Sequence, residues 1–213
     1  PDGHPGAQVN VTVANDNGQD TKDNAFRYNP LPTLASVTPA SGSAQGGTLL
    51  TLNGTGFQLG SPGTNTVLFG ATPASDVTVV NDVTLTCTAP AGPDGAVVDV
   101  SLDNANGGAT LLAAYRFNPV PTLSALAPTD GSALGGTLVT LLGSGFADAS
   151  AGEPLVTFGG IAASDLLVLD DGHVQCTTPP GSGGAQVEVL LANANGIVSL
   201  PSAYRYHALP VLG

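Results

Sequence analysis

Apolar and polar residues alternate along most of this chain, which is the pattern of β-strands that bury one face. In the stretch QVNVTV, Val9, Val11 and Val13 fall on one face and polar side chains on the other. The same alternation predicts a larger set of inward side chains: Leu50, Leu52, Val67, Phe69, Val83, Leu85, Cys87, Val98, Val100, Leu102, Val156, Phe158, Val187, Val189, Leu191, and the aromatics of the AYRF and AYRY ends. No stretch has a convincing helical spacing. The pattern therefore predicts an all-β chain.

The sequence pattern repeats along the chain. The phrase GGTLLTLNGTGF at 46–57 returns as GGTLVTLLGSGF at 135–146, a shift of 89 positions that holds without a gap. Residues 1–28 match the last third of the same unit. A fixed period indicates a repeat array, and 89 residues are enough for each unit to be a domain with its own core.

Each whole unit contains about seven alternating runs separated by turn residues, and the Asn-Gly turns suit tight hairpins. We therefore expect two sandwiches of about seven strands, at 31–117 and 120–206. Residues 1–28 are expected to be the C-terminal part of a preceding repeat, and 207–213 the start of a further joint. Because the joints NPLP and NPVP are short and stiffened by proline, the repeats are expected to form a rod.

Charge excludes several functional classes. The chain has 16 acidic against 4 basic residues and a net charge of −12, whereas nucleic-acid binding depends on cationic contacts to phosphate. The same charge disfavours anionic membrane surfaces. No apolar run approaches the roughly 20 residues of a membrane span, so no membrane insertion of this segment is expected.

Each repeat resembles the IPT/TIG family, the immunoglobulin-like domains of plexins, some transcription factors and many cell-surface proteins. The ordered motifs are the proline after the joint, GGT, GxGF, FG, CTxP, NG and YRF or YRY. The resemblance implies tandem immunoglobulin-like β-sandwiches in an extracellular or cell-surface protein. It departs from the family in one respect: where some members have a second cysteine after FG, this chain reads ATPASDV and IAASDLL. No intradomain disulfide is therefore expected.

No group of residues predicts catalysis, a metal site or a cofactor, so the chain is not expected to be an enzyme. Cys87 and Cys176 are predicted to be buried free thiols. His4, His173 and His207 fall at unrelated positions of the repeat and are expected to be solvated. Two groups of acidic residues are candidate calcium ligands: Asp16, Asp20 and Asp23, and Asp170 with Asp171. Their spacing is not that of an EF-hand loop, and we expect them to lie in turns.

Two further sets of residues carry hypotheses. Asn10 and Asn53 begin N-glycosylation sequons and are predicted to face outward, so attached glycans are possible partners. Arg27, Arg116 and Arg205 are three of the four cations and occupy one repeated position beside the joint. We expect these arginines to hydrogen-bond carboxylate or carbonyl groups at the joints and to help fix the angle between repeats.

Three functions fit these features. The first is a non-enzymatic structural or adhesive segment of a long extracellular protein, such as a filament, stalk or surface fibre. Its partners would be other copies of the protein, or extracellular protein or glycan. The second is the ligand-binding ectodomain of a cell-surface receptor, which a large exposed apolar patch would favour. The third is an accessory domain of a secreted carbohydrate-active enzyme, which predicts exposed aromatic residues on one sheet.

Overall fold

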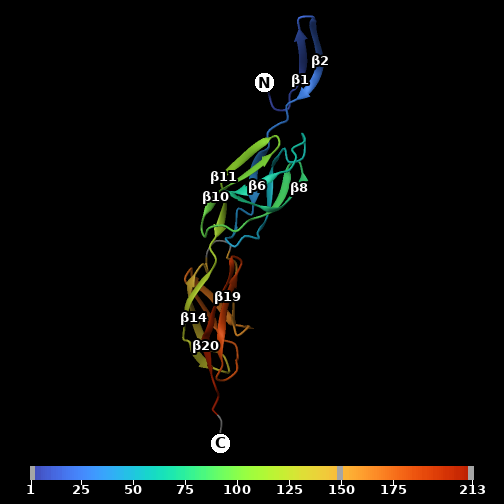
Figure 1. The fold of residues 1–213 in the computed structure, drawn as a ribbon. Helices are drawn as coiled ribbons and strands as arrows, with labels where there is room; N and C mark the ends of the chain where they lie inside the picture. Colours follow the sequence, from blue (N-terminus) through green and yellow to red (C-terminus); the bar gives the residue numbers. More distant parts are fainter. Residues whose placement is uncertain (1–2, 148–150, 211–213) are drawn as a thin grey trace. The chain divides into compact units, whose positions relative to one another are not determined.

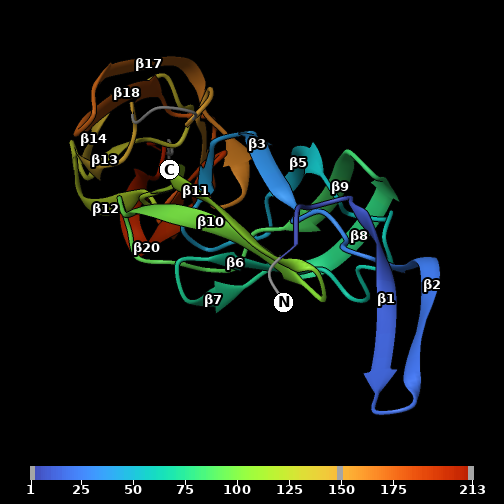
Figure 2. The same ribbon diagram turned by 90° about the horizontal axis from the view of Figure 1, so that it is seen from above.

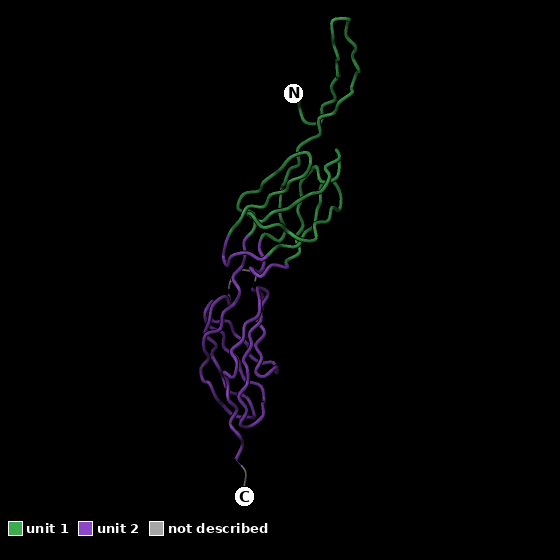
Figure 3. Tube along the Cα trace, in the orientation of Figure 1, with its two compact units in different colours: residues 1–40, 48–90, 97–115 green, residues 41–47, 91–96, 116–213 purple. Residues whose placement is uncertain are grey.

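A computed structural model describes residues 3–147 and 151–210 of the chain, and all regular structure in these ranges is β-strand (Figure 1). The all-β prediction is therefore confirmed. Contacts between residues divide the chain into two units, shown in Figure 3. The first unit contains residues 1–40, 48–90 and 97–115, and the second contains 41–47, 91–96 and 116–213. None of the described residues forms a helix with the length and apolar character needed to cross a membrane.

The first two strands form a hairpin that pairs with no other strand in the described residues. Strand β1 (Gln8–Asn15) runs antiparallel to β2 (Gly18–Arg27), and Asn15 faces Gly18 across the turn. The valines of this hairpin lie on one face as predicted; Val9 is half-buried, but the rest of this face is exposed. Val11 is 44% exposed, Val13 70% and Phe26 51%. This ribbon therefore has an apolar face without a core.

The first repeat is a sandwich of two sheets. One sheet has the order β3-β5-β9-β8 and the other β4-β11-β10-β6-β7. The strand bounds are β3 Thr33–Thr38, β4 Ser41–Ser43, β5 Leu49–Thr55, β6 Thr66–Phe69, β7 Thr72–Pro73, β8 Ser75–Asn81, β9 Thr84–Thr88, β10 Val97–Asn104 and β11 Gly107–Asn118. Seven of these strands have four or more residues, in agreement with the predicted number, and the named alternating runs correspond to β5, β6, β9, β10 and the end of β11; β4 and β7 are too short to show a period.

The second repeat has the same topology. Its sheets have the orders β12-β14-β18-β17 and β13-β20-β19-β15-β16 (Figures 1 and 2). The strand bounds are β12 Thr122–Ala127, β13 Asp130–Ser132, β14 Leu138–Ser144, β15 Leu155–Phe158, β16 Ile161–Ala162, β17 Ser164–Asp170, β18 His173–Thr177, β19 Gln186–Asn193 and β20 Gly196–His207. The short second strand of each repeat pairs in parallel with the last strand, β4 with β11 and β13 with β20. The longer strands pair with one another in antiparallel fashion.

The core of each repeat lies between its two sheets. In the first repeat the fully buried side chains include Leu50, Leu52, Leu85, Cys87, Val67, Phe69, Val100, Leu102, Tyr115 and Phe117. Phe69 and Tyr115 meet edge to face, with ring centroids 5.0 Å apart, a geometry that aromatic pairs prefer. The prediction for Val83 is wrong, because Val83 is in the turn before β9 and is exposed. The apolar alternation of the sequence continues one residue beyond the start of β9.

The repeated phrase GxGF has a steric explanation. A Cβ added at Gly54 would lie 1.9 Å from the carbonyl oxygen of Thr33 on β3, and one at Gly143 would lie 1.8 Å from that of Thr122. Gly56 has φ +80°, a conformation that side chains disfavour. These two glycines bring the chain close to its neighbour and then turn it, so that Phe57 enters the core.

Candidate functional site: the anchored linkers

The linker before the first repeat contacts the hairpin turn of that repeat. Asn29 Nδ2 donates to Asn106 Oδ1 at 3.0 Å. Leu31 lies over Gly107, where an added Cβ would be 2.6 Å from Leu31 Cδ2. The turn therefore holds the linker by one amide pair and one apolar contact, and only glycine leaves room for the second. We call this arrangement an anchored linker.

The same arrangement recurs 89 residues later within the second unit. Asn118 Nδ2 donates to Asn195 Oδ1 at 3.3 Å, and a Cβ at Gly196 would lie 2.8 Å from Val120 Cγ1. Both asparagines are fully buried here. Ser43 Oγ also donates to the backbone oxygen of Asn195 at 2.6 Å. The second anchored linker thus excludes water from its amide pair, whereas the first is only partly buried.

The turn that receives each linker is itself tied to the GxGF loop. Asn104 Oδ1 accepts from the backbone of Asn106 at 2.9 Å, and Asn104 Nδ2 donates to the carbonyl oxygen of Gly56 at 3.0 Å. In the second repeat Asn193 Nδ2 donates to Gly145 at 2.8 Å. The phrases NANG and GxGF, far apart in sequence, therefore form one structure at the end of the sandwich where the linker arrives.

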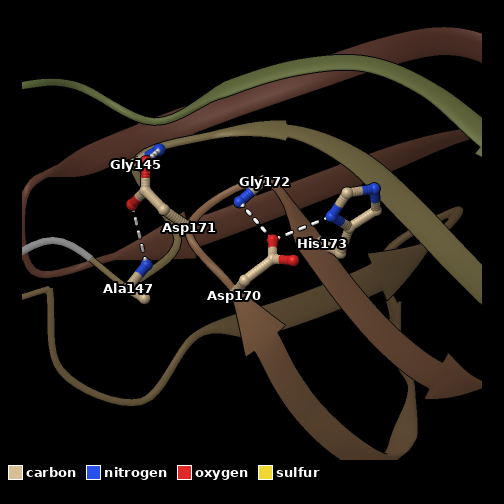
Figure 4. A network of polar contacts seen from close by, with 6 residues as sticks. All are labelled: Gly145, Ala147, Asp170, Asp171, Gly172 and His173. Carbon is tan, nitrogen blue, oxygen red and sulfur yellow. Dashed lines mark hydrogen bonds and ion pairs between the residues drawn. The ribbon is translucent and has the colours of Figure 1, made fainter.

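A carboxylate completes this structure. Asp82 Oδ1 accepts from the backbone amides of Leu59 at 2.8 Å and Gln58 at 3.1 Å, and these hydrogen bonds lower the pKa of Asp82 below its ordinary value. Its counterpart Asp171 accepts from the amides of Gly145 and Ala147, both at 3.2 Å (Figure 4). The role of this recurring aspartate is to hold the loop after GxGF.

The neighbouring Asp170 also forms hydrogen bonds within its own turn. Its Oδ1 accepts from the Gly172 amide and contacts His173 Nδ1, each at 2.8 Å (Figure 4). Both contacts lower the pKa of Asp170, with His173 the larger cause.

No group of three or more potential metal ligands is found within residues 3–147 and 151–210. His207 Nε2 contacts Asp130 Oδ2, both exposed, and His4 is exposed.

The three recurring arginines differ in their surroundings. Arg116 Nη1 donates to Asn118 Oδ1 at 3.1 Å, so this side chain contacts an anchoring asparagine through an amide carbonyl. Arg27 and Arg205 are exposed. A hydrogen bond from the recurring arginine to a carbonyl oxygen is thus present at Arg116, and the role of these arginines in fixing the angle between repeats stays a prediction.

The two cysteines are buried in equivalent places of the two cores and are free thiols. Burial raises the pKa of Cys87 to about 11 and that of Cys176 to about 12. Neither is ionised near neutral pH, so neither is a ready nucleophile.

The two sequon asparagines lie in different settings. Asn10 is on the exposed hairpin, where its side chain bonds Asp23 and the amide of Asn24. Asn53 is on β5, which has β3 and β9 on either side, and its amide donates to Ser36 Oγ at 3.3 Å. Asn53 is only partly exposed, so Asn10 is the more accessible candidate for glycosylation.

From the sequence, Asn29 and Asn118 were expected only as parts of the joints and Asp171 only as part of a turn; their contacts, and Asp82 altogether, were missed. Their recurrence at 89 residues was the available signal. The period marks equivalent positions, but it does not indicate what the side chains at those positions contact.

Comparisons with known proteins found similar proteins in sequence and in structure. The chain is 32% identical to mouse Fibrocystin-L over 178 residues, which is 82% of this chain and 4% of that protein. It is 28% identical to rat Plexin-A3 over 149 residues, 70% of this chain and 8% of that protein. The chain thus spans a small fraction of the relatives it matches. A solved structure of the plexin A4 extracellular region has a TM-score of 0.46 and 18% identity, covering 83% of this chain and 18% of that one.

The family comparison covers both repeats. The model of the IPT/TIG domain family matches residues 32–118 and again residues 121–206, which together are most of the chain. The strand order, the GxGF loop and the turn that receives the linker occur in both matched segments. This chain therefore belongs to the IPT/TIG domain family, of which it carries two tandem copies.

Proposed function

We propose that the chain is a non-enzymatic structural segment of a longer extracellular or cell-surface protein, in which successive IPT/TIG repeats are held by anchored linkers. The observation that carries this proposal is the recurrence of the anchored linker: an asparagine pair and an apolar residue over glycine, repeated at 89 residues. A flexible tether would need no such contacts. Residues that restrict a linker at each repeat suit a stalk or filament whose length and stiffness matter.

The alternatives have less support. An accessory carbohydrate-binding role predicts exposed aromatic residues, but the aromatic side chains of both repeats are buried. The fold and the anchored linkers of this chain are also compatible with a receptor ectodomain, but that function would need a ligand surface as well. Other copies of the protein, or extracellular protein or glycan, are the proposed partners of the segment.

Spin labels or dyes placed one on each repeat would test the proposal. We expect a narrow distance distribution for the unaltered chain and a broader one for Asn118→Ala combined with Val120→Gly, which removes both anchoring contacts. Leu112→Ala is a matched control, since Leu112 is an exposed leucine on β11. A broad distribution in the unaltered chain, or no change in the variant, would overturn the proposal.

We also propose that residues 1–28 are the last third of a preceding repeat. The exposed Val11, Val13 and Phe26 align with Val100, Leu102 and Tyr115, which are fully buried. Because Pro1 aligns with Pro90, fusing a copy of residues 31–89 in front of Pro1 would supply the missing strands. We expect the amides of β1 and β2 to become protected from hydrogen exchange in this fusion. If they exchange as fast as in the original chain, the assignment is wrong.

A further inference from the structure

The second repeat has a groove with both apolar and polar lining at one edge of its sandwich. Its volume is about 470 Å³. It is lined by Gly152, Glu153 and Pro154 before β15, and by Leu166, Leu167 and Val168 of β17. None of its lining residues belongs to the anchored linker, although Gly152 lies beside the turn at Asn195, where an added Cβ would be 3.8 Å from Ala194 Cβ.

One wall of the groove is a sheet edge. Strand β17 is the outermost strand of its sheet and pairs with β18 on one side only, so among the described residues no strand covers its other side (Figure 2). Its pairing with β18 is irregular near Asp165 and again near Leu169, which leaves a short regular stretch at Leu167 and Val168. Such an edge offers backbone groups to a short extended segment.

The equivalent edge of the first repeat shows which residues of this edge the fold requires. At the position of Leu167 it has Thr78, and at that of Pro154 it has Asn65, whose amide donates to the carbonyl of Phe57 at 2.8 Å. In the second repeat Leu167 is 54% exposed; the exposed Leu169 beside it has an apolar, exposed counterpart, Val80, so the difference between the repeats lies at Leu167. Because the same frame is built with threonine in one repeat and leucine in the other, the exposed leucine is not required by the fold.

Charge identifies the kind of partner. Glu153 lies in the groove, and Asp165 and Asp170 lie toward the two ends of β17. The sequence between 120 and 206 contains one cation, Arg205, which is on β20 in the other sheet. A second copy of this chain would bring carboxylates against carboxylates. A basic partner would gain from the same field.

We propose that this groove binds an extended apolar segment of another protein, flanked by lysine or arginine residues. Its apolar side chains pack on Leu166, Leu167 and Pro154, its backbone pairs with the open edge of β17, and its flanking cations lie near Glu153 and Asp165. The second repeat is thereby a docking module, and the first repeat is not.

The test uses the whole chain and a synthetic nine-residue peptide, KKVSVSVKK, followed by NMR shifts of backbone amides. We expect shifts confined to residues 152–155 and 164–170, with binding that weakens as salt is raised. Leu167→Thr installs the residue of the first repeat and should weaken binding about fivefold or more, because a half-exposed leucine loses its burial in the complex. Leu112→Thr removes an exposed leucine elsewhere and should leave binding unchanged.

Charge reversal gives an independent arm. Glu153→Lys should weaken binding of the basic peptide and strengthen binding of the acidic peptide EEVSVSVEE. Equal binding of both peptides by the unaltered chain, shifts outside the groove, or unchanged binding by Leu167→Thr would each overturn the proposal. So would concentration-dependent dimerisation lost in Leu167→Thr, which would assign the groove to a second copy. Because none of these variants alters an anchored linker, failure here is distinct from failure of the proposed structural role.

Discussion

Removing one side chain of the buried amide pair should destabilise the second repeat. In Asn118→Ala, Asn195 Oδ1 loses the donor that lies 3.3 Å away and stays in a site from which water is excluded. Leaving a buried acceptor unsatisfied costs about 1–3 kcal/mol, and we expect about 2 kcal/mol, roughly a thirtyfold change in the equilibrium constant. The lost contact between Arg116 and Asn118 adds little, because a partly exposed hydrogen bond is replaced by water.

The first anchored linker provides the matched control. Asn29→Ala removes a hydrogen bond of similar length, 3.0 Å, but its partner Asn106 is only half-buried and can be solvated. We expect a cost below about 1 kcal/mol. Native-state hydrogen exchange, read separately for the amides of residues 107–117 and 196–206, measures each effect in its own repeat. If Asn118→Ala costs no more than Asn29→Ala, burial of the amide pair does not determine its contribution.

Two further predictions concern the cores. Gly143→Ala places a Cβ 1.8 Å from the Thr122 carbonyl oxygen and must separate β12 from β14. We therefore expect the free energy of unfolding to fall by more than about 3 kcal/mol, measured by urea unfolding followed by circular dichroism. Gly160→Ala, where φ is +83° but no atom lies within 4 Å of the added Cβ, should lower it by about 1 kcal/mol. A loss for Gly143→Ala no larger than for Gly160→Ala would contradict the steric explanation of GxGF. For the thiols, the raised pKa values of Cys87 and Cys176 mean that folding favours the neutral form, so their contribution to stability is full below about pH 9 and is lost as pH rises toward 11 to 12. A thiol reagent at pH 8 should therefore find two thiols in denaturant and almost none in the native chain, and rapid native labelling would show that these cores open.

Alternation predicted the cores well, because a half-buried strand imposes a period of two on its own sequence. Leu50, Leu52, Val100 and Leu102 are buried for that reason. It failed for Val83, where the strand had not yet begun.

The anchored linkers could not be derived in the same way. Asn118 and Asn195 are 77 residues apart, and their contact depends on where the folded turn lies rather than on any local pattern. Recurrence marked the positions without indicating what they contact. The groove at β17 was missed for a different reason: a leucine at the position of a threonine looks like one more core residue until burial is known.

The parallel pairing of the short second strand with the last strand of each repeat has a mechanical consequence. In the first repeat Ser41, Gly42 and Ser43 of β4 pair with Arg116, Phe117 and Asn118 of β11, and β13 pairs with β20 in the same way. When a protein chain is pulled from its two ends, parallel strands near those ends are drawn past each other along their length. Their hydrogen bonds then share the load and break together, instead of opening one after another as at a hairpin tip. Each repeat should therefore resist tension in a single high-force event, governed by its unfolding rate rather than by its equilibrium stability.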